Sequence, residues 1–408
     1  MSFAKNIFYM FVVQVSNYIA PLAVLPFLTR VLGPENFGKM AVIYSICAVS
    51  MVISDYGFSL SGTSYVSRNR NDKRKIGYYI YSVFIIKIII SIATLLLILL
   101  YLIEFSNFES IFSIFSVLTV IILSQTFQFT WFYQGIEKMK AISIYSLISK
   151  LTYVSLVFFF VRNDDDVMLV LWSYAFSQVL SSLISLFGVY KLGFRFKRTP
   201  LSHVIEVAKN GGLFFISRLS VTVYTTSNTI LISNFSGLAA SGIYSSAEKL
   251  YQAGQNVTSP VTQVLFPTMV RKKCFKYLFK IVFSLYIPIL ISCIVSYIYA
   301  EEIMTIFFGE EFRSGADTLR LLMILLSINF LNANLGYPAF AIIDKLNQCN
   351  LSVIIGSITH FGILFGIWVT FGINSVSLVY ALIITELIVF FIRLGFLLNE
   401  NRLRKKVG

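Results

Sequence analysis

Twelve long runs of apolar residues follow one another along the chain, each separated from the next by a short polar segment. A helix needs about 20 residues to cross roughly 30 Å of hydrocarbon, and every run is about this long. We therefore predict an all-α integral membrane protein with about twelve transmembrane helices. The predicted spans are residues 7–28, 40–61, 79–102, 111–133, 142–161, 167–190, 211–233, 241–266, 278–300, 318–340, 351–371 and 374–398.

The eighth predicted span contains two adjacent charged residues, Glu248 and Lys249. An ionised group at the centre of a membrane helix costs roughly 2.5–3.5 kcal/mol on insertion scales, so such groups normally face a bundle interior or a wet cavity. Two interpretations follow: an ion pair that braces two helices, or a lysine that faces a central pathway and meets an anion there. Adjacent helical residues point about 100° apart, which favours different surroundings for the two side chains.

Other charged residues also lie within predicted spans. Long basic side chains near a span end can reach the interface, and we expect this for Arg393. The deeper cations predict a shared cationic cavity, and Asp55 is expected to pair with Lys87. The predicted cavity residues are Lys249, Arg218, Lys150, Lys87 and Arg30, and the candidates for a coupling site or a counter-charge are Glu248, Asp55 and Glu386.

The charge of the chain follows a membrane-topology rule. Charged residues make up only 13% of the 408 residues, against about 25% in soluble domains. The net charge of +14 does not indicate nucleic-acid binding, because the loops on one side of the predicted membrane hold 23 basic residues and the opposite loops five. Basic loops stay in the cytoplasm. Both termini are therefore predicted to be cytoplasmic.

A weak internal repeat divides the chain in two. Lys5-Asn6 recurs as Lys209-Asn210, and Gly38 as Gly242, both at an offset of 204 residues. A repeat in the same direction implies two bundles with a substrate site between them. We predict an N-terminal six-helix bundle over residues 1–190, a cytoplasmic linker over 191–210 and a C-terminal six-helix bundle over 211–408.

No pattern for catalysis, a metal or a cofactor is visible in the sequence. The four cysteines are scattered without a Cys-x-x-Cys pair, and His203 and His360 are far apart. A nucleotide-binding loop and a nucleophile–base pair are also missing. We predict that the protein is not an enzyme, holds no metal and needs no cofactor.

Five segments spread along nearly the whole chain resemble a known family in content and order: residues 32–38 (LGPENFG), 55–58 (DYGF), 131–139 (WFYQGIEKM), 244–250 (YSSAEKL) and 307–309 (FFG). Together they resemble Wzx-type polysaccharide flippases of the multidrug/oligosaccharidyl-lipid/polysaccharide exporter superfamily. The resemblance implies two six-helix bundles around a V-shaped central cavity, and alternating access without ATP hydrolysis by the protein itself. It also implies the substrate, an undecaprenyl-diphosphate-linked oligosaccharide unit moved from the cytoplasmic to the periplasmic leaflet of the bacterial inner membrane.

Such a cargo suits the interior charges. Basic side chains in a wet cavity can replace the hydration of the diphosphate, while the prenyl tail stays in membrane lipid. A glycan polymerase and a chain-length regulator are candidate partners. One alternative is an ion-coupled exporter of drugs or organic cations, which would favour acidic or aromatic cavity groups. A membrane glycan polymerase, the other alternative, would need a long catalytic outer loop. Interior bases outnumber interior acids five to three, which favours the flippase.

Overall fold

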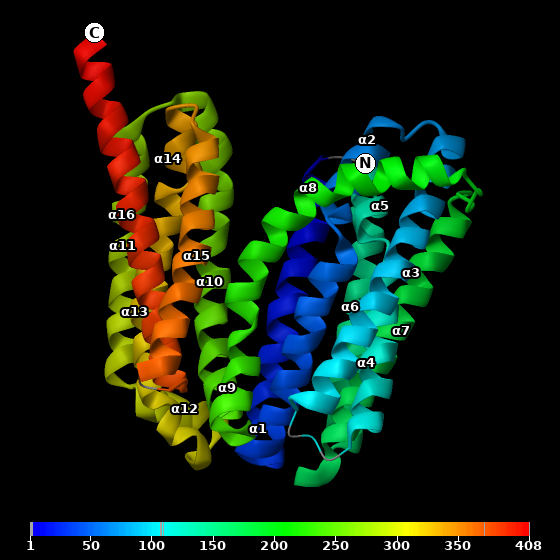
Figure 1. Cartoon of the computed structure of the whole chain (residues 1–408), viewed down its shortest axis with the longest axis horizontal. Helices are drawn as coiled ribbons and strands as arrows, with labels where there is room; N and C mark the ends of the chain where they lie inside the picture. Colours follow the sequence, from blue (N-terminus) through cyan, green and yellow to red (C-terminus); the bar gives the residue numbers. More distant parts are fainter. Residues whose placement is uncertain (1–2, 107, 109, 371, 408) are drawn as a thin grey trace. The chain divides into compact units, whose positions relative to one another are not determined.

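The computed structural model describes the backbone of residues 3–106, 108, 110–370 and 372–407; within it, the side chains of 3–22, 213, 214, 216–226, 267 and 400–407 lie outside the described residues. All regular structure in the described chain is helical (Figure 1). The longer helices are α1 (Phe3–Asp55), α3 (Lys73–Glu104), α4 (Ile111–Thr126), α6 (Met139–Phe160), α7 (Val167–Lys191), α8 (Leu201–Thr226), α10 (Leu238–Lys272), α11 (Phe275–Ile298), α13 (Ala316–Leu335), α15 (Leu346–Thr370) and α16 (Ser375–Val407). The shorter ones are α2 (Phe58–Arg68), α5 (Thr130–Gly135), α9 (Asn228–Ser236), α12 (Ala300–Phe308), α14 (Tyr337–Ile342) and the 3-10 helices η1 (Asp164–Asp166) and η2 (Glu310–Gly315).

Nine helical stretches of the described residues are long and apolar enough to cross a membrane. They correspond to nine of the twelve predicted spans and confirm an all-α membrane protein. The predicted spans 7–28 and 211–233 consist largely of residues with undescribed side chains. The span 241–266 lies within α10, which is long enough to cross but rich in Ser, Thr, Gln and Asn. The total of twelve spans stays a prediction.

The chain divides into two compact units, residues 1–230 and 231–408. The predicted linker 191–210 packs on the first unit. Phe194, Val204 and Val207 are buried in its core, and the amide of Lys197 donates to the Gly77 carbonyl at 3.2 Å. The units therefore divide beyond the end of this segment. The assignment of a six-helix bundle to each side of it stays a prediction.

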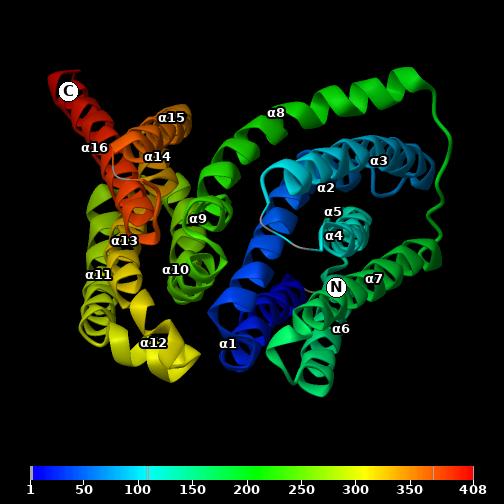
Figure 2. The same ribbon diagram turned by 60° about the horizontal axis from the view of Figure 1, so that its bottom comes forward.

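Aromatic side chains build the core of the first unit at the end that holds α2 and α5. Trp131, Phe132 and Tyr133 on α5 are buried, and α4 lies inside the unit against α1, α3 and α7 (Figure 2). The Tyr133 hydroxyl donates to the Ser185 carbonyl at 2.6 Å. A Cβ at Gly62 would lie 2.8 Å from the Trp131 ring. The segment 131–139 is thus a packing motif at its aromatic end.

Several helices are interrupted within their spans. The segment 32–38, which the span boundaries place in a loop, is helical in α1 except for a kink at Gly33, where φ is 66°. The span predicted for 40–61 breaks at Tyr56 and Gly57, both with positive φ, and continues as α2. Two further breaks separate α4 from α5 and α13 from α14.

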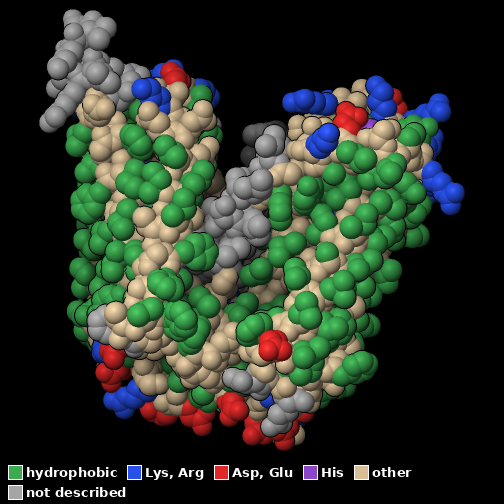
Figure 3. Space-filling view, in the orientation of Figure 1, with side chains coloured by type: hydrophobic (Ala, Val, Ile, Leu, Met, Phe, Trp, Pro, Cys, Tyr) green, Lys and Arg blue, Asp and Glu red, His purple; other side chains and the backbone are tan. Residues whose placement is uncertain are grey.

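The second unit is centred on α13, which packs against α10, α11, α14 and α16. Its buried core includes Met269, Leu278, Phe330 and Phe340. In both units, large apolar side chains cover the flanks of the helices, and charged side chains lie at the helix ends (Figure 3). Exposed apolar flanks of this kind are suited to contact with lipid.

Candidate functional site

The polar residues of α10 join it to α13. Gln255 Nε2 donates to the Tyr251 hydroxyl at 2.7 Å, and the Asn329 amide on α13 donates to the same oxygen. Farther along, Thr262 Oγ1 donates to Asn334 Oδ1 at 3.1 Å. Polar residues in membrane helices commonly serve such interhelical contacts. These side chains therefore account for part of the polarity that separates α10 from the nine strongly apolar stretches.

Lys249 is half-buried on α10, and its Nζ donates to Gln252 Oε1 at 3.2 Å. No carboxylate of the described residues forms a salt bridge with it. Glu248 and Lys249 do not pair with each other, as their angular separation on the helix predicts, and Glu248 makes its contact elsewhere. Lys249 is thus a cation held by a neutral amide inside a long helix.

Lys87, on α3, is buried within the first unit, with its side chain 6% exposed. Its Nζ lies 3.8 Å from Asp55 Oδ1 and donates to the Thr126 carbonyl at 3.3 Å. The predicted pair of Asp55 and Lys87 is therefore confirmed. The ammonium is surrounded by groups of its own unit, because both partners come from helices that pack against α3 or each other.

Glu386 lies at the edge of a buried polar network in the second unit. Asn332 Nδ2 donates to Glu386 Oε2 at 2.6 Å. Arg393 Nη1 donates to the Asn332 carbonyl at 2.6 Å, and its Nε to Ser352 Oγ at 2.9 Å. The expectation that Arg393 reaches the interface is wrong: the side chain is buried and is held by α13 and α15. The acceptor of Arg393 Nη1, the Asn332 carbonyl, lies in the last turn of α13, just before the break that separates α13 from α14.

The remaining predicted cavity residues are not brought together by the described contacts. Lys150 is half-buried on α6, and no described residue forms a salt bridge or hydrogen bond with it. Arg30 is exposed on α1, three residues before the kink at Gly33. Arg218 lies outside the described side chains. A single cavity shared by the predicted cations stays a prediction.

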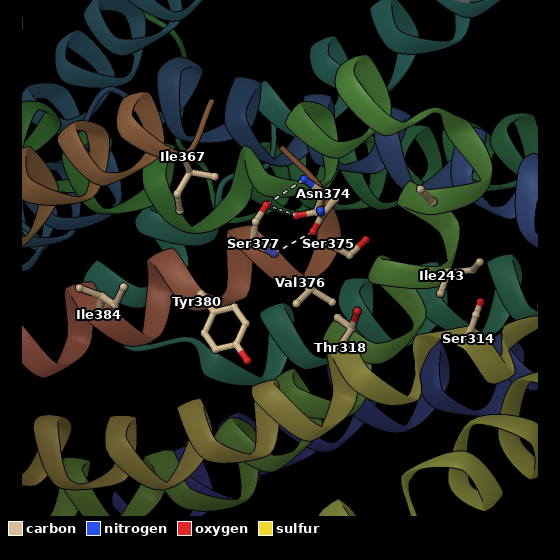
Figure 4. Close-up of a pocket in the computed structure, with 11 residues that line it drawn as sticks. Ile243, Ser314, Thr318, Ile367, Asn374, Ser375, Val376, Ser377, Tyr380 and Ile384 are labelled. Atoms are coloured by element: carbon tan, nitrogen blue, oxygen red, sulfur yellow. Dashed lines mark hydrogen bonds between the residues drawn. The ribbon is translucent and has the colours of Figure 1, made fainter. Parts of the chain in front are cut away.

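An open pocket of about 660 Å³ lies on the second unit, among α10, η2, α13, α15 and α16. At the start of α16, Asn374 and Ser377 bond to each other, and Tyr380 follows one turn later (Figure 4). Thr318 on α13 and Ile243 on α10 also line it. None of its lining residues is charged, so this pocket is no site for a diphosphate. Its residues come from five separate segments, and no sequence pattern connects them. Among the described residues, no group of three His, Cys, Asp or Glu side chains could hold a metal ion.

Helices that break within the membrane and buried, paired charges are features of membrane transporters. The chain belongs to the polysaccharide biosynthesis protein family, whose model matches residues 3–273. Two relatives, from Shigella dysenteriae and Escherichia coli (strain K12), each carry the name "Putative O-antigen transporter". The first is 26% identical over 396 residues, which cover 94% of this chain and 97% of that protein. The second is 26% identical over 268 residues, 65% of each chain. The resemblance predicted from the five segments is confirmed.

Solved structures share the fold. The lipid II flippase MurJ, in an inward closed conformation, superposes with a TM-score of 0.74 at 14% identity, covering 97% of this chain and 90% of MurJ. An inward-facing multidrug resistance transporter of the MATE family, from the MOP superfamily, gives 0.72 at 13% identity, covering 94% and 96%. At such identities the similarity establishes the fold. It agrees with the predicted all-helical architecture.

Proposed function

We propose that this protein is a flippase for undecaprenyl-diphosphate-linked oligosaccharide units, which it moves from the cytoplasmic to the periplasmic leaflet by alternating access. The observation that carries the proposal is the relationship, over 94% of the chain, to a protein named for O-antigen transport. The fold shared with a protein named as a lipid II flippase supports it. The protein is a transporter, not an enzyme.

The interior cations fit the charge of this cargo. A diphosphate that leaves water loses its hydration, and cationic side chains can replace it with charge-assisted hydrogen bonds. Lys249 is suited to this because its described partner is the neutral Gln252 amide, which an anion can displace. Lys150 has no described partner to lose. Arg218, as a planar donor, would bind phosphate oxygens bidentately.

The protein acts in the bacterial inner membrane, with both termini in the cytoplasm. The glycan then emerges on the side where a polymerase and a chain-length regulator would use it. The asymmetry of basic residues between alternate loops supports this orientation. The exposed apolar flanks of the helices support a lipid environment.

An ion-coupled exporter of organic cations is the second candidate, because a MATE transporter has the same fold. Such a cargo would need an interior carboxylate free to meet a cation. Two of the three interior acids have described partners that reduce this freedom: Asp55 pairs with Lys87, and Glu386 accepts from Asn332. The charge balance inside the chain therefore favours an anionic cargo.

Deletion of the gene, with complementation, tests the function. The deletion strain should lose surface polysaccharide and accumulate complete lipid-linked units that are protected from impermeant reagents in intact cells. Wild-type protein should restore both, and Lys249→Ala should not, at equal abundance in the membrane. Normal surface polysaccharide in the deletion strain, together with resistance to a cationic drug that depends on the gene, would instead establish the exporter.

A further inference from the structure

Each unit contains a helix that breaks partway, and in both units a buried cation lies at the end of its longer piece. In the first unit, α4 ends at Thr126, and Lys87 Nζ donates to the Thr126 carbonyl at 3.3 Å. In the second unit, α13 ends at Leu335, and Arg393 Nη1 donates to the Asn332 carbonyl at 2.6 Å. Each cation comes from a neighbouring helix, α3 or α16, and both side chains are buried.

The breaks create the acceptors that these cations bind. A carbonyl in the last turn of a helix has no amide partner four residues on, and an unsatisfied polar group is costly away from water. In the first unit, the amide of Phe129 leaves the helical pattern and donates to Ser185 Oγ at 3.0 Å. In the second, Gly336 takes a non-helical ψ of −118° directly after α13. A cation at a helix C-terminus is also favoured by the helix dipole.

Both cations have a carboxylate close by that offsets the cost of burial. Asp55 ends α1, and it pairs with Lys87 through one oxygen while the other accepts the amide of Ser59 on α2 at 3.2 Å. Lys87 therefore connects two breaks, that of α1 and that of α4. In the second unit, Asn332 accepts from Arg393 through its main-chain carbonyl and donates to Glu386 through its side-chain amide.

We propose that Lys87 and Arg393 are positioning residues, which hold the short helices α5 and α14 beyond the breaks and do not bind the anionic cargo. Each already donates to a main-chain carbonyl of its own unit, which a diphosphate would have to displace. At Lys87 a diphosphate would also break the ion pair with Asp55. Lys87 is thereby removed from the predicted cationic cavity. The proposal rests on the proposed function only in taking transport as the process that the short helices serve.

Two contacts can report the position of the short helices. In the first unit, Thr63 Oγ1 on α2 donates to the Trp131 carbonyl on α5 at 3.1 Å and lies 3.4 Å from Gln134 Oε1. In the second, the rings of Phe266 on α10 and Tyr337 on α14 meet with their centroids 6.1 Å apart. Cysteine pairs at 63 and 134, or at 266 and 337, in a variant without native cysteines, should react with a short bifunctional thiol reagent in membranes.

The experiment measures the rate of this cross-linking together with export of surface glycan. Lys87→Gln should slow the 63–134 cross-link by about tenfold, since a stranded buried charge strongly favours rearrangement, and should reduce export. Lys87→Arg should restore both in part. The matched control is Lys150→Gln, which should reduce export and leave the cross-link at the wild-type rate. Arg393→Gln and Arg393→Lys are compared in the same way with the 266–337 pair.

Loss of export in Lys87→Gln with an unchanged cross-link would overturn the proposal, because it is the behaviour of a cargo ligand. An unchanged cross-link and unchanged export would overturn it as well. If Lys87→Gln does not accumulate, Asp55→Asn/Lys87→Gln replaces it, since no buried charge is then stranded. Recovery of the cross-link and of export in this double variant supports positioning; recovery of the cross-link alone supports a ligand. Should the proposed function fail, glycan export would not depend on the wild-type protein, while the cross-linking result would still stand.

Discussion

The side-chain amide of Asn332 donates to two oxygens of Glu386, the carboxylate Oε2 at 2.6 Å and the main-chain carbonyl at 2.8 Å. Asn332 is buried, and its own carbonyl accepts from Arg393. Asn332 therefore links Glu386 to Arg393, which lies about two turns farther along α16. From this arrangement we expect Glu386 to act as a counter-charge, one of the two roles predicted for it.

The two partners should respond differently to substitution. Glu386→Gln keeps an oxygen that can accept from Asn332, so abundance, thermal stability and export should stay close to wild type. Asn332→Leu removes the donor and leaves the carboxylate unsatisfied, which costs about 1–3 kcal/mol. Thermal unfolding in detergent and membrane abundance measure the difference. Loss of export in Glu386→Gln at normal abundance would contradict this assignment and identify Glu386 as a coupling site.

Gly62 on α2 is required by the close approach of Trp131 on α5. An added Cβ would lie 2.8 Å from the indole ring, which is buried and cannot move freely. Gly62→Ala should therefore destabilise the protein by about 1–3 kcal/mol, more than the gain of up to about 1 kcal/mol from helix propensity. The matched control is Gly366→Ala on α15, where a Cβ meets nothing within 4 Å. Thermal unfolding should place the two variants on opposite sides of wild type or leave the control unchanged.

Glu301, at the start of α12, accepts from Arg313 at 3.0 Å and from Arg320 at 3.2 Å. The hydrogen bonds from Arg313 and then Arg320 hold the pKa of its carboxyl below the usual 4.5. The folded state thus gains stability that is fully present above this value and is lost as the pH falls through the lowered pKa. Glu301→Gln should lower the melting temperature slightly at pH 7 and make no difference in strong acid.

The effect of Glu301 should be small because the ion pairs lie at the protein surface and are screened by salt. Glu302→Gln, one residue on, is the control, since Glu302 forms no ion pair with a described residue. Equal melting temperatures for the two variants at pH 7 and low salt would refute the contribution of the outer ion pairs.

Apolar runs predicted the long helices well: nine of the twelve predicted spans match described helical stretches that are long and apolar enough to cross a membrane. The break between α4 and α5 could not be predicted: residues 127–129 contain neither glycine nor proline, and the break depends on Ser185 of α7 accepting the Phe129 amide. The break after α13 had a local signal in Gly336. The predicted span 241–266, within α10, is less apolar than the nine, because some of its polar groups serve contacts with α13.

For the candidate site, the sequence predicted one pair correctly and one cation incorrectly. Asp55 and Lys87 were matched through their similar depth in neighbouring spans. The position of Arg393 close to the end of a span predicts that it reaches the interface. Its guanidinium is instead buried, where it donates to the carbonyl of Asn332, 61 residues away in sequence. A helix carbonyl that needs a donor has no sequence signature of its own.

The topology predicts that Arg198 faces the cytoplasm. Its side chain is exposed in the segment between α7 and α8. A cysteine at 198, in a variant without native cysteines, should resist an impermeant thiol reagent in intact cells and react after the membrane is opened. A cysteine at the exposed Asp165, in the turn before α7, should react in intact cells. Labelling at 198 in intact cells would reverse the predicted orientation.

Lys249 and Glu248 carry the last prediction. If the two charges stabilised each other, each single neutral variant would be harmed, typically by about 3–5 kcal/mol, and the double variant would recover. The structure gives Lys249 a different partner, Gln252 at 3.2 Å, and a contact of Glu248 elsewhere. Recovery is therefore not expected.

We predict that Lys249→Gln and Glu248→Gln/Lys249→Gln both lose export at wild-type abundance, because each removes the charge that meets the diphosphate. Lys249→Arg should keep part of the export, and Lys249→Glu none. Glu248→Gln tests whether this acid carries a coupling proton: export should then become independent of the outer pH, while cargo binding through Lys249 persists. Restored export in the double variant would show a structural pair and remove Lys249 from the pathway.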